Sequence, residues 1–189
     1  MDEIALQMGV SKKTIYQYYT DKDQLVDVVI VDIIAHNQTC CLKDKQQAKD
    51  AIHEVFLAID MMQEMFQHMN PSILYELEKY YPKAFEKFKQ FKYAFLYKVL
   101  TENINRGIKE ELYRSEIETD ILVKARLETM MVPFNQTIFP KNKYSLVKVE
   151  TEVTTHYLFG LATVKGYKLI TKYQQDRNKK TNINEKILA

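Results

Sequence analysis

Apolar positions recur at spacings of three and four over most of the chain. The clearest case is the segment 48–69, whose apolar positions are Ile52, Val55, Phe56, Ile59, Met62, Phe66 and Met69. This spacing places them on one face of a helix. By contrast, no segment alternates apolar and polar residues for long enough to indicate a strand. The pattern therefore predicts an all-α protein.

Proline, glycine and polar residues mark the expected ends of the helices. A long helix should start near Asp21, and Asn70-Pro71 should end the helix over 48–69, because proline disfavours a helical residue before it. Gly107 should close a central helix that Pro82 opens. This central helix is expected over 83–105. Further helices are expected over 72–80, 120–136 and 144–175, followed by a polar, frayed tail.

The first 25 residues predict two short helices joined by a turn. Ile4 and Met8 lie one turn apart on the first helix, and Gly9 follows where a left-handed residue would end it. Ser11 can cap the second helix through its hydroxyl. The outer face of that helix carries Lys12, Lys13, Thr14, Tyr16, Gln17 and Tyr18. Cations, hydroxyls and amides of this kind bond phosphate oxygens and base edges of DNA.

This stretch resembles the DNA-binding end of the TetR family of bacterial transcriptional regulators. The matching residues are Ile4-Ala5, Gly9-Val10-Ser11, Thr14-Ile15-Tyr16, Tyr18-Tyr19, Lys22 and Leu25. The chain departs from the family at Lys13, where a small residue is usual, and at Tyr19, where Phe is usual. In the family another helix precedes this motif, so we expect an incomplete three-helix head that lacks its first helix.

The resemblance implies a ligand-responsive transcriptional regulator, interpreted as a repressor, that binds a palindromic operator on double-stranded DNA as a homodimer. The residues expected to contact DNA are Ser11, Lys12, Lys13, Thr14, Tyr16, Gln17, Tyr18 and Lys22. The expected domains are a partial helix-turn-helix over 1–24, a helical ligand-binding and dimerisation domain over 25–175, and the tail over 176–189. An alternative stays open, in which the chain is a helical dimerisation and small-molecule-binding module that does not bind DNA.

Charge and cysteine content limit the possible partners and the cellular location of the protein. A net charge of +2 is too small for a general nucleic-acid coat, although residues 11–22 carry three lysines against one acid. Cys40 and Cys41 are adjacent and form no framework of disulfides. We find no signal peptide and expect no apolar stretch of membrane-spanning length. These features predict a cytoplasmic protein with no membrane partner.

Aromatic and methionine residues gather between positions 56 and 97, and they allow two interpretations. One is an ordinary core. The other is a pocket for a small apolar or aromatic effector, since methionine suits a cavity of adaptable shape and TetR-family regulators bind a small molecule inside their helical domain. The candidate pocket residues are Phe56, Met62, Met65, Phe66, Tyr75, Phe88, Phe91 and Phe95.

The last predicted helix carries a seam of apolar and small residues. Its plain interpretation is packing within the chain, whereas the resemblance favours an interface made by the last two helices of two subunits. The candidate interface residues are Val149, Val153, Tyr157, Gly160 and Val164.

Features that would indicate an enzyme are weak. Asp60, Glu64 and His68 share one helix face, but a metal site in a bundle generally needs a second helix that supplies Glu and His. The sequence has no glycine-rich phosphate loop and no marked pairing of a nucleophile with histidine. We therefore expect no catalytic activity, no metal and no cofactor.

Overall fold

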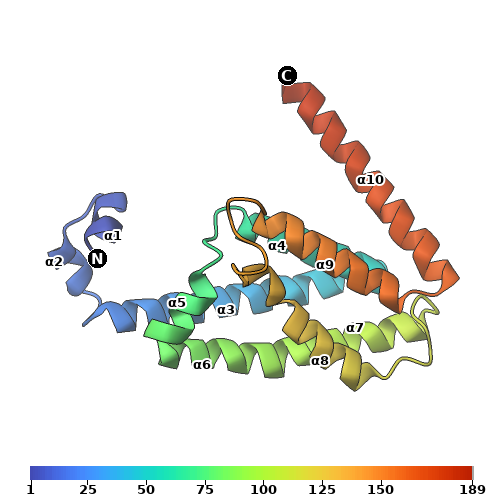
Figure 1. Ribbon diagram of the computed structural model, residues 1–189, viewed down its shortest axis with the longest axis horizontal. Coiled ribbons are helices and arrows are strands. Elements are labelled where there is room, and N and C mark those ends of the chain that lie inside the picture. Colours follow the sequence, from blue (N-terminus) through green and yellow to red (C-terminus); the bar gives the residue numbers. More distant parts are fainter. Residues whose placement is uncertain (189) are drawn as a thin grey trace.

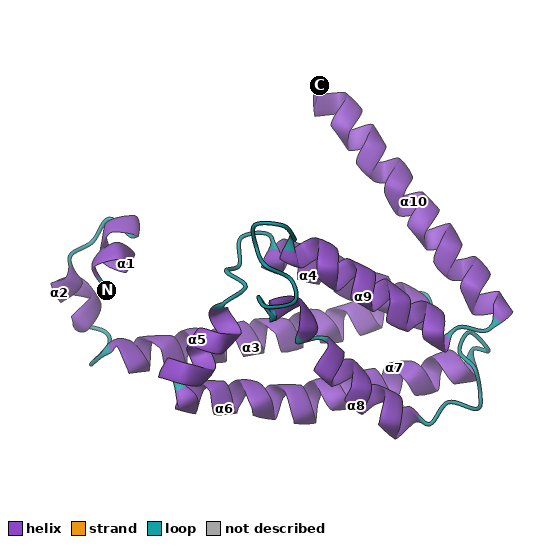
Figure 2. Cartoon of the chain, in the orientation of Figure 1, coloured by secondary structure: helices purple, strands orange, loops and turns teal. Residues whose placement is uncertain are grey.

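The computed structural model describes the backbone of residues 1–188 and the side chains of residues 1–179. Every regular element in this range is a helix, apart from an isolated bridge between Tyr113 and Ala162 (Figure 2). The predicted all-α class is thus confirmed.

The helices form a small head, a bundle and a long final arm. They are α1 (Asp2–Gln7), α2 (Lys12–Tyr16), α3 (Lys22–Gln47), α4 (Ala51–Phe66), α5 (Ile73–Tyr80), α6 (Pro82–Gln90), the π-helix η1 (Phe91–Leu96), α7 (Tyr97–Lys109), α8 (Thr119–Thr129), the 3-10 helix η2 (Val132–Phe134), α9 (Leu146–Leu161) and α10 (Val164–Leu188). Figure 1 shows α1 and α2 at one end of α3, which runs from this head into the bundle.

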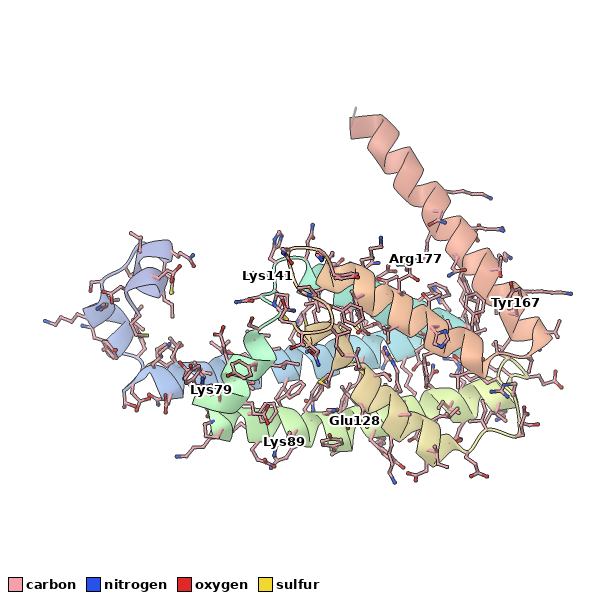
Figure 3. The ribbon with its side chains drawn as sticks, viewed as in Figure 1. Lys79, Lys89, Glu128, Lys141, Tyr167 and Arg177 are labelled. Atoms are coloured by element: carbon pink, nitrogen blue, oxygen red, sulfur yellow. The ribbon has the colours of Figure 1, made fainter. Side chains whose placement is uncertain are left out.

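The core of the bundle lies around α4, which contacts α3, α7, α9 and α10. The buried residues of α4 include Ile52, Phe56, Ile59, Met62 and Phe66, the positions that its sequence spacing predicts. Polar contacts join α10 to α4. Tyr173 donates a 2.6 Å hydrogen bond to Asp50. Arg177, which Figure 3 labels on α10, pairs with Asp60 at 2.5 Å. Helix α4 thus packs against its neighbours through buried apolar residues and is also joined to α10 by polar contacts.

Gly107 does not end a helix, as the sequence suggested, but lies inside α7. A Cβ atom at this position would lie 2.0 Å from the ring of Tyr113. The glycine is therefore required for the close packing of Tyr113, and the left-handed residue after the helix is Glu111, with φ of 59°. A π-helical segment, η1, lies between α6 and α7, and the sequence did not indicate it.

Three other predicted boundaries differ from the structure. The helix expected over 144–175 is two helices, because Thr163 leaves the helical path and its N–H donates to the carbonyl of Leu112 at 2.9 Å. The helix expected over 120–136 ends at Thr129, with Pro133 in a separate 3-10 turn. The last helix, α10, extends to Leu188 and thus includes most of the segment expected to be a polar tail, since no proline or glycine stops the helix there; the fraying of that segment stays a prediction.

Helix α3 is, among the described residues, the one helix long and apolar enough to cross a membrane by length and composition. The sequence analysis expected no such stretch. Within the bundle α3 lies along α4 and α6, and Ile30, Ile33 and Ile34 line a cavity there. No residue of α3 is buried, and Val29, Val31 and Leu42 are 44%, 43% and 54% exposed, so only part of its apolar surface packs against the bundle.

Candidate DNA-binding head and apolar cavity

The turn between α1 and α2 follows local rules that the sequence carries. Gly9 has φ of +66°, the left-handed conformation that glycine adopts most easily. Ser11 Oγ accepts a 3.0 Å hydrogen bond from the N–H of Thr14, which caps α2. Ala5 and Ile15 are the buried residues of the two helices. The predicted glycine stop and serine cap are both present.

The outer face of α2 is open to solvent. Lys13, Tyr16, Gln17 and Tyr18 are exposed there, and Thr14 is half-buried. Lys12 is also exposed, but its ammonium pairs with the carboxylate of Asp2 on α1. The face therefore offers one cation without an ion pair among the described residues, together with two phenol hydroxyls and an amide.

Lys22, unlike the other residues predicted to bind DNA, contacts the bundle. Its ammonium lies 5.5 Å from the centre of the Tyr81 ring, at the junction of α5 and α6. A hydrogen bond with Tyr81 raises the pKa of Lys22 above its usual value. On the same side, Lys87 of α6 pairs with Asp27 of α3 at 2.6 Å. These two contacts fix the first turns of α3 to α6.

Part of the predicted apolar face of the head is uncovered. Met8, which was expected on the buried side with Ile4, is 65% exposed, and Leu6, which was not part of the predicted face, is 81% exposed. Helix α2 has five residues and covers Ala5 but not these side chains.

Replacing Gly9 with alanine should loosen the head. No atom lies within 4 Å of the added Cβ, so the cost comes from the left-handed backbone, about 1–2 kcal/mol. Amide hydrogen exchange in α2 should then quicken about 5- to 30-fold, with little change in α4. Exchange rates equal to those of the unmodified chain would show that the stability of the turn does not depend on the left-handed backbone at residue 9.

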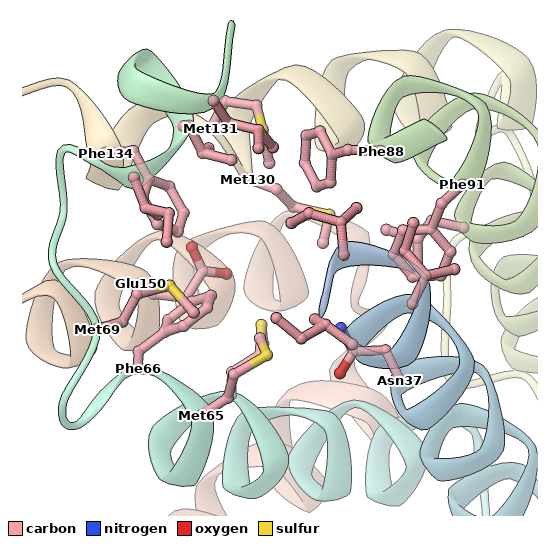
Figure 4. Close-up of a pocket in the computed structure, with 18 of the residues that line it drawn as sticks. Asn37, Met65, Phe66, Met69, Phe88, Phe91, Met130, Met131, Phe134 and Glu150 are labelled. Carbon is pink, nitrogen blue, oxygen red and sulfur yellow. The ribbon is translucent and has the colours of Figure 1, made fainter. Parts of the chain in front are cut away.

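A cavity of about 150 Å³ lies in the bundle between α3, α4, α5, α6, η1, η2, α9 and the turn that follows α8 (Figure 4). Its wall includes six of the eight methionines of the chain: Met61, Met62, Met65, Met69, Met130 and Met131. The polar side chains in the wall are those of Asn37, Cys41 and Glu150. Burial raises the pKa of the Cys41 thiol to about 11, so this thiol is protonated at neutral pH.

Five of the eight predicted pocket residues line this cavity: Met62, Met65, Phe66, Phe88 and Phe91. The other three do not. Phe56 faces α10 and contacts the ring of Tyr173, with centroids 5.6 Å apart. Phe95 stacks on Phe91 outside the cavity, and Tyr75 is exposed on an open groove. Helical spacing did not distinguish these faces, because apolar residues cover several sides of the segment 85–97.

A second cavity of about 100 Å³ adjoins the first. The two share Cys41, Met61, Met62, Leu96 and Met130 as lining residues. The second cavity is more polar, and its wall includes Asp44, Glu54, Arg126 and Tyr157. A molecule in the larger cavity could therefore extend toward charged groups.

A buried ion pair lies beside both cavities. Arg126 of α8 and Glu150 of α9 have side chains that are 3% and 4% exposed, and Arg126 Nη2 donates to Glu150 Oε1 at 2.9 Å. Thr154 Oγ1 donates to the same Oε1 at 2.8 Å. The sequence pattern did not predict this pair. The available signal was an acid among the apolar positions of α9.

The predicted dimer seam does not form one surface. Val149 is buried in the chain, and Tyr157 packs beneath the Arg126 guanidinium, which lies 5.3 Å from the ring centre. Burial raises the pKa of Tyr157 to about 12. Val153 is half-buried, whereas Gly160 and Val164 are exposed. The break after α9 separates Val164 from the rest, so intrachain packing accounts for much of the seam.

Comparison with known proteins gives a match at the head. Residues 1–29 match the family model of bacterial regulatory proteins of the tetR family. The chain is also 30% identical over 86 residues to the uncharacterized HTH-type transcriptional regulator YvaF of Bacillus subtilis (strain 168). This alignment covers 44% of the chain and 45% of YvaF, so the matched part is less than half of that relative. No solved structure matches the chain.

Proposed function

We propose that this chain is a TetR-family transcriptional regulator that binds a palindromic operator as a homodimer and represses transcription until a small molecule enters the bundle; the match at its N-terminal segment supports the family. The outer face of α2 supports the DNA contact, since its amide and hydroxyls suit base edges and phosphates. Such binding would take place in the cytoplasm.

The continuity of α3 is the observation that carries this proposal. This helix of 26 residues follows the DNA-binding head directly and also forms one wall of the apolar cavity. A ligand that separates α3 from α4 or η1 would tilt the head, because Lys22 and Asp27 fix the start of α3 to α6. Helix α3 would thus act as one rigid element that links the cavity in the bundle to the DNA-binding head.

The proposed dimer uses the exposed surface where α9 meets α10. Gly160 has no atom within 4 Å of an added Cβ, and Val164 and Tyr167 are 75% and 58% exposed. An apolar surface of this kind at one side of a helix pair suits a two-fold contact. Two heads related in this way would read half-sites about 34–36 Å apart.

The test is a titration against labelled DNA from just upstream of the gene, with scrambled DNA as control. The chain should prefer the upstream sequence, and Gln17→Ala should cost about 1–3 kcal/mol and relax specificity at one base position. Tyr16→Phe should weaken binding to both DNAs equally, since a phosphate contact carries no sequence information.

Lys143→Ala is the matched control, because Lys143 is exposed on the loop before α9 and far from the head in the chain. Equal, salt-sensitive binding to both DNAs, unchanged by Gln17→Ala, would contradict the proposed reading face. It would favour the alternative of a helical ligand-binding and dimerisation module that does not read DNA.

A further inference from the structure

The larger cavity has one charged lining residue, Glu150. Figure 4 shows its carboxylate near Phe66, Met69 and Phe134, on the side of the cavity that α9 forms. Almost all of the remaining wall is aliphatic, aromatic or thioether. A carboxylate in such a wall needs a hydrogen-bond donor on each oxygen, since burial removes water.

The two oxygens of Glu150 differ in this respect. Oε1 accepts from Arg126 Nη2 and from Thr154 Oγ1, at 2.9 and 2.8 Å. Oε2 is fully buried and accepts from no donor among residues 1–179. The pair with Arg126 is thus made through one oxygen, and the second oxygen is free to accept from a molecule in the cavity.

Charges around the adjoining cavity favour a cation. Asp44 Oδ2 is also buried without a donor among the described side chains, and no ion pair there reaches Asp44. Arg126 pairs with Glu150 through one oxygen, and Arg106 pairs both with Glu54 at 3.2 Å and with Glu110 at 2.7 Å. Arg126 Nη1 is the one unpartnered donor beside two unpartnered acceptors. The charged side chains that line the two cavities are thus three acids, Asp44, Glu54 and Glu150, against one cation, Arg126, which leaves their wall negative.

We infer that the cavity binds a lipophilic amine, with an aromatic or aliphatic body among the methionines and a protonated nitrogen that donates to Glu150 Oε2. This rests on the proposed small-molecule response and names the chemical class of that effector. The volume suits one aromatic ring, because an apolar cavity of about 150 Å³ holds benzene. Methionine side chains can adjust to bodies of different shape.

The test compares toluene, benzyl alcohol and benzylamine, which share one ring and differ in the donor group. Binding is followed by NMR of the full chain labelled at its methionine methyl groups with carbon-13. The six cavity methionines should shift, whereas Met1 and Met8 in the head serve as internal controls. Benzylamine should bind about tenfold or more tightly than toluene, since its hydrogen bond to Glu150 is charge-assisted.

Glu150→Gln should reduce benzylamine binding to the level of toluene and leave toluene binding unchanged, which also shows that the variant is folded. Glu152→Gln is the matched control, because Glu152 is exposed on the same helix. Benzylamine binding that survives Glu150→Gln, or that equals benzyl alcohol binding, would overturn the inferred cationic class alone. If toluene shifted no cavity methionine, the small-molecule response itself would be overturned.

Discussion

Replacing Arg126 with methionine is expected to lower the free energy of unfolding by about 3–5 kcal/mol. The methionine side chain fills much of the same space, but it leaves the carboxylate of Glu150 buried without a cation. The hydrogen bond from Arg126 Nη2 to Thr154, at 2.6 Å, is lost as well. Urea denaturation followed by circular dichroism measures the change.

The double variant Arg126→Met with Glu150→Met should recover most of this loss, because replacing both members of a buried ion pair with apolar residues is often close to neutral. Lys124→Met on the same helix is the surface control. It removes a 2.8 Å pair with Asp120 whose two side chains are exposed, and little change is expected. If Arg126→Met behaved like Lys124→Met, water would have to reach Glu150 freely.

The parts of the fold that depend only on residues close together in the sequence could be predicted from the sequence. The spacing of Ile52, Phe56 and Ile59 predicts α4, and these side chains are buried as expected. Gly9 and Ser11 predict the turn before α2, since the left-handed backbone and the hydroxyl cap need nothing from distant residues. The all-α class follows from the same local patterns.

The break between α9 and α10 could not be predicted in this way. Ala162 and Thr163 contain no helix breaker, and the path changes there because Thr163 bonds to Leu112, some fifty residues earlier. Gly107 was misinterpreted for a related reason. A glycine inside a helix and a glycine after one look alike until the ring of Tyr113 is placed above it.

The cavity was predicted in part. Met62, Met65 and Phe66 on α4 were identified because one helix carries them at regular spacing. The walls from α3 and from the turn after α8 were missed, since no local pattern shows which distant segments meet. The polar anchor, Glu150, comes from a helix that sequence analysis assigned to the dimer interface. Site chemistry that combines distant elements thus required the tertiary structure.

Replacing Gly166 with alanine is expected to destabilise the chain by about 3 kcal/mol, at the upper end for added groups in a packed site. The new Cβ would lie 2.1 Å from the carbonyl oxygen of Leu112. This oxygen belongs to the backbone and accepts from the N–H of Thr163 at 2.9 Å, so it cannot move aside without breaking the contact that separates α9 from α10.

Gly160→Ala is the matched control, because both glycines are helical and lie six positions apart across the break. No atom of the same subunit lies within 4 Å of an added Cβ at Gly160, so alanine should stabilise α9 by up to about 1 kcal/mol at a protein concentration low enough to keep the chain monomeric. Thermal unfolding should therefore move in opposite directions for the two variants, by about 2–4 °C for each kcal/mol. Similar shifts for both would mean that α10 does not cross Leu112 closely in solution. Loss of stability at Gly160 alone, growing with protein concentration, would instead indicate that a second subunit packs against that glycine.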